Sequence, residues 1–205
     1  MKQIFLIHGG DSFETYDDYL EYLVNYRIDF PKFEKLGLRK KYWEGKLNER
    51  LGEDFQVIRP EMPNKRNAKY IEWKIWFEKF LPFIKDEIIL IGGSLGGIFL
   101  AKYLAENDFP KKIKAVFFLA APFGDNLPEY RLLDFSLPKN IEKIMSQAKN
   151  IFLYQSKDDN IVPFADVKKY KKALPCAIVR IFEDKGHFNI EEFPELVKDI
   201  NDLWI

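Results

Sequence analysis

The sequence is poor in the residues that usually bind metals or form disulfides. Its 205 residues include one cysteine, Cys176, and two histidines, His8 and His187. A single cysteine forms no intrachain disulfide and is typical of a reducing compartment, so we expect a cytoplasmic protein. Two histidines without a second cysteine are too few for a structural zinc site. We therefore expect no metal site.

The sequence also lacks an excess of charge and a long apolar run. Its 32 basic and 32 acidic side chains cancel, which argues against a nucleic-acid partner. The longest apolar run, Ala115–Ala121, is far shorter than a membrane span, and Ile4–Ile7 is too short for the core of a signal peptide. We expect neither nucleic acid nor membrane as a partner, and the sequence identifies no protein partner.

No repeat, low-complexity tract or linker-like stretch divides the chain, which predicts one domain over residues 1–205. Short apolar runs alternate with longer amphipathic segments, the pattern of βαβ units. Most runs are continuous, as expected of parallel strands covered on both faces. The sequence thus predicts an α/β fold. The expected strands are Gln3–Ile7, Phe55–Ile58, Glu87–Ile91, Ile113–Leu119, Ile151–Gln155 and Ala177–Phe182, and the expected helices are Lys40–Leu51, Ala68–Pro82, Leu95–Glu106, Asn140–Lys149, Phe164–Leu174 and Ile190–Trp204.

One connection is longer than a crossover needs. Between Gly10 and the strand at Phe55 the helix Lys40–Leu51 suffices, which leaves Asp11–Leu38 as an insertion. Its apolar residues recur at helical spacing, which predicts an amphipathic helix carrying Tyr16, Tyr19, Leu20, Leu23 and Tyr26. Because the insertion follows the end of the first strand, we expect it near the edge where open α/β sheets bind ligands. It either adds core packing or forms a partial lid at the mouth of the site.

Four glycines surround one serine in Ile88–Gly97, IILIGGSLGG. A dinucleotide motif needs a glycine two residues after Gly92, and a P-loop needs Gly-Lys-Ser/Thr, so neither phosphate-binding motif fits. Gly92–Gly96 instead matches G-x-S-x-G, in which the serine occupies a strained strand-to-helix turn. The residues two before and two after that serine must be small, because the two backbones nearly touch. An expected strand and helix flank the motif, which predicts Ser94 as a nucleophile.

A serine nucleophile needs a general base, and with this motif the order along the chain is Ser, then Asp or Glu, then His. His187 is the histidine that follows Ser94, and it lies after the last expected strand. The acid is expected after the preceding strand, where Asp158 and Asp159 are adjacent, and the residues themselves do not choose between them. Asp125, after the fourth strand, is a further candidate.

The oxyanion of an acyl-transfer reaction needs N–H donors. One is expected from Leu95, the residue after the nucleophile, at the positive end of its helix. The other is expected in the loop after the first strand, where a glycine lets the backbone approach a substrate. Gly10 is the favoured residue and Asp11 the alternative. His8 precedes the serine along the chain and is expected to be structural.

With these motifs the sequence resembles the α/β-hydrolase fold and, more narrowly, the small serine hydrolases of the YdeN and retinoblastoma-binding-protein-nine type. The motifs are HGG, RPEMPN, IGGSLGG, SKDDNIVP and KGHF, and the resemblance covers nearly the whole chain outside Asp11–Leu38. It implies a three-layer α/β/α hydrolase core, a mainly parallel six-stranded sheet of order 2-1-3-4-5-6, and no large cap domain. It also implies Asp159 as the acid, since the family's acid stands four residues before the proline of D-x-x-V/L-P.

We therefore expect a serine hydrolase that cleaves a small-molecule acyl substrate through an acyl-enzyme on Ser94, without a cofactor. A small ester is the expected substrate, and a thioester or an amide is the alternative substrate. Met62 and the insertion are expected to line the acyl pocket. The insertion departs from the family pattern, so substrate preference does not transfer. The alternative is a protein-binding module on a hydrolase scaffold, which the intact motifs disfavour.

Overall fold

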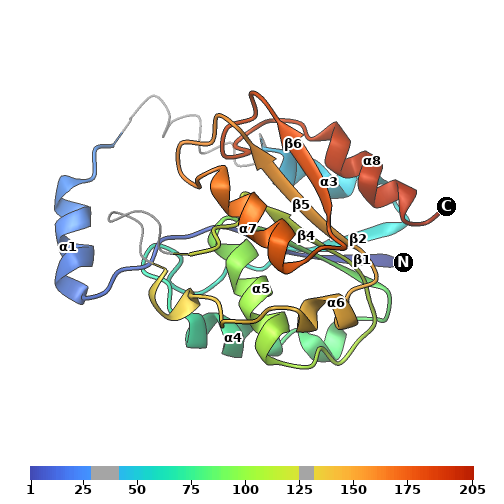
Figure 1. Ribbon diagram of the computed structural model, residues 1–205, viewed down its shortest axis with the longest axis horizontal. Helices are drawn as coiled ribbons and strands as arrows, with labels where there is room; N and C mark the ends of the chain where they lie inside the picture. The colour runs from blue at the N-terminus through green and yellow to red at the C-terminus, as the bar shows by residue number, and fades with distance from the viewer. Residues whose placement is uncertain (29–41, 125–131) are drawn as a thin grey trace.

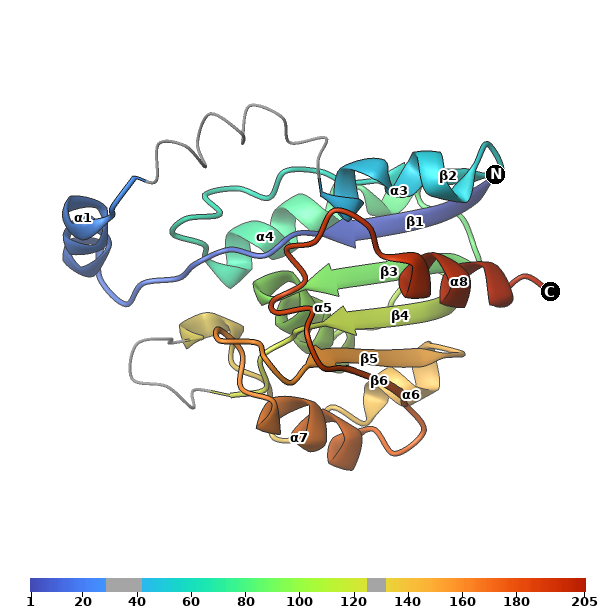
Figure 2. The ribbon, with the colours of Figure 1, turned by 90° about the horizontal axis from the view of Figure 1, so that it is seen from above.

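The loops that carry the predicted site residues follow the strands of a central sheet. The computed structural model describes residues 1–28, 42–124 and 132–205. Its strands lie in the order β2-β1-β3-β4-β5-β6, and each neighbouring pair is parallel (Figure 1). The predicted strand order is confirmed, and the loops at the carboxyl ends gather at one edge (Figure 2). The strands are β1 (Lys2–Ile7), β2 (Phe55–Ile58), β3 (Ile88–Gly93), β4 (Ile113–Leu119), β5 (Ile151–Ser156) and β6 (Ile178–Phe182).

Helices cover both faces of this sheet. One face carries α3 (Trp43–Leu51) and α8 (Pro194–Asp202), and the other carries α4 (Tyr70–Glu78), α5 (Leu95–Glu106), α6 (Lys143–Gln147) and α7 (Ala165–Ala173). Side chains alternate between the two faces along a strand, so Ile4 and Leu6 of β1 pack under the first group, and Phe5 and Ile7 under the second. Short 3-10 turns form at η2 (Leu81–Phe83) and η3 (Leu133–Phe135). Within the described ranges, no helix combines the length and apolar character needed to cross a membrane.

Several predicted helices differ from the observed ones, and two of the differences have local reasons. α8 begins at Pro194, not at Ile190, because proline fits the first helical turn and interrupts a helix interior. In α4 the apolar residues Ile71 and Ile75 are 57% and 53% exposed. Its buried face is formed by larger side chains, Tyr70, Trp73 and Phe77.

The insertion contributes a helix that stands apart from the core. α1 (Tyr16–Asn25) begins with a capping box, in which the side chains of Thr15 and Asp18 each accept a hydrogen bond from the other's backbone N–H. The predicted helix is confirmed, yet none of its residues is buried. Figures 1 and 2 place α1 beyond the carboxyl ends of the strands, away from the other helices. α1 therefore adds no core packing; residues 29–38 of the insertion lie outside the described ranges.

The turn between β3 and α5 brings backbones into contact. A methyl group on Gly92 would lie 2.4 Å from the carbonyl oxygen of Gly96, and one on Gly96 would lie 2.4 Å from that of Ile7. Both distances are far below van der Waals contact, so glycine alone fits at either position. Ser94 stands between them with φ 53° and ψ −124°, a backbone conformation that residues with side chains rarely adopt. The strand–turn–helix context expected for Ser94 is present.

Gly96→Ala is expected to lower the free energy of unfolding by roughly 1–3 kcal/mol, because its Cβ would meet two backbone carbonyl oxygens that cannot move aside. Gly93→Ala is the matched control, since nothing lies within 4 Å of a methyl group at Gly93. Its unfolding free energy should change by less than about 0.5 kcal/mol. Urea unfolding followed by circular dichroism measures both variants, and equal stabilities would contradict the close approach.

Candidate active site

Loops at the carboxyl edge of the sheet enclose a cavity of about 270 Å³, which we call the serine cavity. Ser94 and His187 both line it, although they lie far apart in the sequence. Leu119 and Phe188 form an apolar part of its wall, and Asp11, Glu44 and Asn189 form a polar part. The sheet topology thus brings the predicted nucleophile and the predicted base to one cavity.

Ser94 is fixed by its backbone. Its N–H donates to the carbonyl of Leu119 at 2.8 Å, which ties the turn to the end of β4. A methyl group on Gly9 would lie 3.0 Å from the Cβ of Ser94 and 3.5 Å from its Oγ, so a glycine there keeps the hydroxyl accessible. Among the described residues, no hydrogen bond joins Ser94 to His187, although both residues line the serine cavity. Catalytic hydrogen bonds of this kind often form only with a substrate present.

His187 is held by a buried carboxylate. Its Nδ1–H donates to Asp159, at 2.9 Å from Oδ2 and 3.1 Å from Oδ1, and the Asp159 side chain is fully buried. The backbone N–H groups of Ile161 and Val162 donate to Oδ1 at 2.9 and 3.0 Å, and the Gln155 amide donates to Oδ2 at 3.0 Å. Because the carboxylate holds the proton on Nδ1, the Nε2 atom keeps its lone pair and can accept a proton.

The pKa of Asp159 reflects opposing effects. Burial raises it, because the charged form loses contact with water. The hydrogen bond and charge of His187 lower it, and so do the N–H groups of Val162 and Ile161. The lowering effects are larger in sum, so the pKa of Asp159 lies below its ordinary value and the group is ionised at neutral pH.

Asp158, the neighbouring candidate acid, contacts backbone rather than imidazole. Its Oδ1 accepts hydrogen bonds from the Ser156 hydroxyl at 2.5 Å and from the N–H of Gly186 at 2.9 Å. These hydrogen bonds, that of Ser156 first, hold the pKa of Asp158 below its ordinary value. Gly186 belongs to the loop that follows β6, residues 183–189, which we call the histidine loop. Of the two aspartates, Asp159 is the one that contacts the ring, and Asp125 lies outside the described residues.

The two residues expected to supply the oxyanion donors are close to each other. A methyl group on Gly10 would lie 3.4 Å from a side-chain carbon of Leu95. In the described part of the chain, the N–H groups of Gly10 and Leu95 donate to no protein acceptor. The N–H of Asp11, the alternative donor, instead binds the carbonyl of Lys65 at 2.8 Å. This geometry favours Gly10 over Asp11.

His8 and Met62 have structural surroundings. The N–H of Met62 donates to His8 Nε2 at 2.9 Å, so the other nitrogen, Nδ1, carries a proton and donates to the carbonyl of Gly9 at 2.6 Å. His8 therefore joins the loop after β1 to the loop after β2, in line with its expected role. Met62 is 1% exposed, packs in the core and is not among the residues lining the serine cavity. The expectation that Met62 lines an acyl pocket is thus corrected: its side chain is part of the core.

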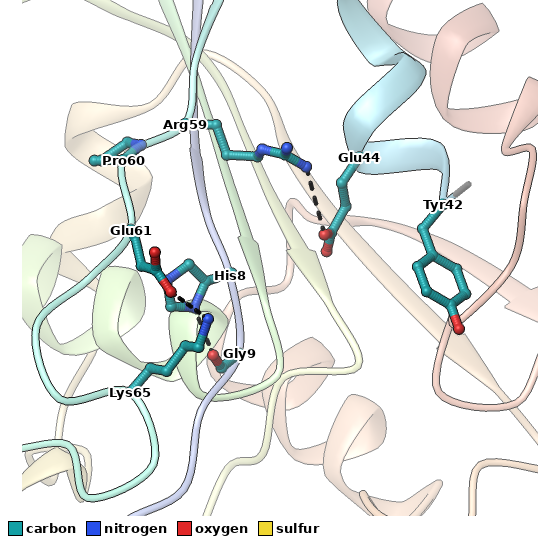
Figure 3. A pocket seen from close by; sticks show the side chains of 8 residues that line it. All are labelled: His8, Gly9, Tyr42, Glu44, Arg59, Pro60, Glu61 and Lys65. Atoms are coloured by element: carbon teal, nitrogen blue, oxygen red, sulfur yellow. Dashed lines mark hydrogen bonds and ion pairs between the residues drawn. The ribbon is translucent and has the colours of Figure 1, made fainter. Parts of the chain in front are cut away.

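A second cavity, of about 420 Å³, adjoins the serine cavity, and Gly9 and Glu44 line both. We call it the polar cavity, because charged side chains surround it (Figure 3). Arg59 extends toward Glu44, with 3.8 Å between the guanidinium and a carboxylate oxygen. Lys65 forms an ion pair with Glu61. The two cavities therefore adjoin, with Ser94 and His187 in the wall of one and the charged side chains of Arg59 and Lys65 in the wall of the other.

Sequence reasoning missed two polar residues at the end of β5 that form hydrogen bonds to the aspartates of the site. Gln155 and Ser156, at the end of β5, are 1% and 0% exposed and hold Asp159 and Asp158 respectively. Their signal in the sequence is two polar residues that end an otherwise apolar strand, since buried polar groups need hydrogen-bond partners. No cluster of His, Cys, Asp or Glu that could hold a metal occurs within residues 1–28, 42–124 and 132–205. The arrangement as a whole is suited to nucleophilic attack by Ser94 on a carbonyl carbon.

Comparison with known proteins identifies a family and two relatives. The chain matches the family described as serine hydrolase over residues 36–196. It is 28% identical to the serine hydrolase RBBP9 of Rattus norvegicus over 155 residues, which cover 73% of this chain and 78% of that protein. It is 26% identical to the protein YdeN of Bacillus subtilis (strain 168) over 194 residues, which cover 93% of this chain and 88% of YdeN.

Solved structures agree on the fold. The crystal structure of the ydeN gene product from B. subtilis matches with a TM-score of 0.72 at 19% identity, covering 100% of this chain and 99% of that one. A serine hydrolase involved in carbazole degradation, the CarC enzyme, matches with a TM-score of 0.64 at 13% identity, covering 100% and 91%. At such identities the structural likeness concerns the fold alone.

The ionised form of Asp159 is expected to stabilise the fold. Because its folded-state pKa lies below the ordinary value of about 4, this contribution is present above that pH and is lost as the pH falls through the folded-state pKa. Asp159→Asn should therefore lower the free energy of unfolding at pH 7 by on the order of 1–2 kcal/mol. The difference from the native protein should shrink between pH 5 and pH 3, as measured by urea unfolding. A difference that stays constant over that range would contradict the assignment.

Proposed function

Since the chain belongs to the serine hydrolase family, we propose that it hydrolyses small esters through an acyl-enzyme formed on Ser94. His187 acts as the general base, and Asp159 orients it. The observation that carries the proposal is the meeting of these groups at one cavity: Ser94 on its strained turn lines the same space as His187, whose Nδ1–H donates to Asp159 at 2.9 Å. We also propose that the protein acts in the cytoplasm, because the exposed thiol of Cys176 is free, as is typical of a reducing compartment.

The reaction proceeds in two halves. Ser94 Oγ attacks the ester carbonyl carbon while its proton passes to His187 Nε2, and the N–H groups of Gly10 and Leu95 bind the oxyanion that forms. His187 then protonates the leaving alcohol as its C–O bond breaks, which leaves the acyl group on Ser94. A water molecule gives a proton to His187 and attacks the acyl carbon; the acid leaves and the proton returns to Ser94. Asp159 remains ionised and stabilises the imidazolium. No cofactor takes part.

The two cavities support a small ester with a polar group. The serine cavity, at about 270 Å³ with Leu119 and Phe188 in its wall, has room for a small apolar group. The adjoining polar cavity, with Arg59 and Glu44, suits a group that forms hydrogen bonds. The same steps cleave a thioester or an amide, which differ in the leaving group. Esters are preferred here because an alcohol is a better leaving group than an amine.

A fluorophosphonate probe, which reacts with activated serines, should label the native protein and fail to label Ser94→Ala. Ser146→Ala is the control, because the Ser146 hydroxyl donates to the carbonyl of Lys143 on α6, outside both cavities. The control should label like the native protein. Labelling that persists in Ser94→Ala would reject Ser94 as the nucleophile. A native protein that takes no label would favour the alternative, a protein-binding module on a hydrolase scaffold.

Hydrolysis of short-chain nitrophenyl esters tests the base and the acid. His187→Ala should lower kcat by on the order of 10⁶-fold, because Ser94 then has no group to take its proton. Asp159→Asn should cost about 10⁴-fold, because an amide stabilises neither the tautomer nor the imidazolium. Asp158→Asn should cost far less. A larger loss in Asp158→Asn than in Asp159→Asn would reverse the assignment of the acid.

A further inference from the structure

Adjacent aspartates hold the histidine loop in different ways. Asp159 binds the ring, whereas Asp158 binds the backbone: its Oδ1 accepts from the N–H of Gly186 at 2.9 Å, directly before the histidine. The hydroxyl of Ser156 donates to the same oxygen at 2.5 Å and accepts from the N–H of Lys185 at 2.9 Å. These three hydrogen bonds, which we call the Asp158 clamp, join the end of β5 to the histidine loop.

The backbone next to the clamp has an unusual conformation. Gly186 and Phe188 have φ values of 51° and 55°, so His187 stands between two left-handed residues. Positive φ is uncommon for a residue with a side chain, and a bulky one such as Phe188 needs surrounding contacts to keep it. On the far side of His187, the indole N–H of Trp43 donates to the carbonyl of Phe188 at 3.1 Å. The loop is therefore fixed before the histidine by Asp158 and after it by Trp43.

We propose that Asp158 is a positioning residue, which fixes the backbone of His187 so that the imidazole reaches Asp159 and Ser94 together. The proposal rests on the proposed function, which gives His187 its role as base. Asp158 and Asp159 extend from the same loop after β5, so one support holds both the backbone and the ring. With the clamp removed, Asp159 would still hold the ring and Trp43 the backbone after the histidine, but the backbone before the histidine would lose its tie to β5 and could shift.

Because the Asp158 side chain is exposed, loss of the clamp is expected to affect activity more than stability. The Asp158 side chain is exposed, so water can replace it as the acceptor for the N–H of Gly186. An exchange of this kind changes the free energy of unfolding little. The position of His187 affects the rate more strongly, since a displacement of about 1 Å at a catalytic group can cost on the order of 10²-fold in rate. The effect is therefore expected in kcat.

Asp158→Ala should lower kcat on a nitrophenyl ester by about 10-fold to 100-fold and leave KM within about twofold. Asp158→Asn keeps an oxygen that can accept both hydrogen bonds, and should keep kcat within about threefold of native. Asp86→Ala is the matched control. Asp86 is also exposed and accepts from a backbone N–H, that of Lys112 at 2.9 Å, but it precedes β3 at the opposite edge of the sheet. This control should keep the native kcat.

Proton NMR of the imidazole gives a readout that does not need catalysis. The Nδ1–H signal of His187, assigned by its loss in His187→Ala, reports the hydrogen bond to Asp159. It should persist in Asp158→Asn and in Asp86→Ala, and should weaken by faster exchange with water in Asp158→Ala. Native kcat and a native signal in Asp158→Ala, or equal losses in the alanine and asparagine variants, would overturn the positioning role. This pattern of signals in a protein without esterase activity would support the clamp and contradict the proposed function.

Discussion

The close approach of α5 to the ends of β1 and β3 is the constraint on which the site depends. Methyl groups on Gly92 or Gly96 would lie within 2.4 Å of a backbone oxygen, so the strand and the helix meet with no side chain between them. This contact forces the chain through a turn in which Ser94 takes a strained backbone conformation. The turn also sets the hydroxyl above Gly9, in the loop after β1. Backbone packing, rather than contacts of its own side chain, decides where Ser94 stands.

The other half of the site is specified by pairing of polar groups. Asp159, whose side chain is fully buried, accepts hydrogen bonds from a ring, a side-chain amide and two backbone N–H groups. In such surroundings a donor without an acceptor is costly, so one arrangement is strongly favoured over others. At the end of β5, Gln155 donates a hydrogen bond to Asp159 and Ser156 donates one to Asp158. Packing therefore positions the nucleophile, and directional hydrogen bonds position the histidine.

The sequence predicted those parts of the structure that depend on local pattern. β2, β4 and α5 begin and end where expected, because apolar runs and the glycine motif define them. The residues alone could not separate Asp158 from Asp159, because the choice depends on where β5 ends and on what the histidine loop offers, and neither is local. The surroundings of Met62 are not local either: its N–H binds His8, from the loop after β1, and its side chain packs in the core. For α1, the spacing predicted an apolar face, and spacing carries no information on what covers such a face.

β6 lies at the edge of the sheet, with β5 as its one neighbouring strand. Edge strands separate from a sheet more readily than central ones, because fewer backbone pairs and apolar contacts hold them. The chain passes from β6 directly into the histidine loop, whereas Ser94 stands between the central strand β3 and α5. Local opening at this edge would withdraw the base and leave the nucleophile in place. Gentle heating or dilute denaturant would then inactivate the protein reversibly before the core unfolds, and the temperature range of activity would be set by one edge strand.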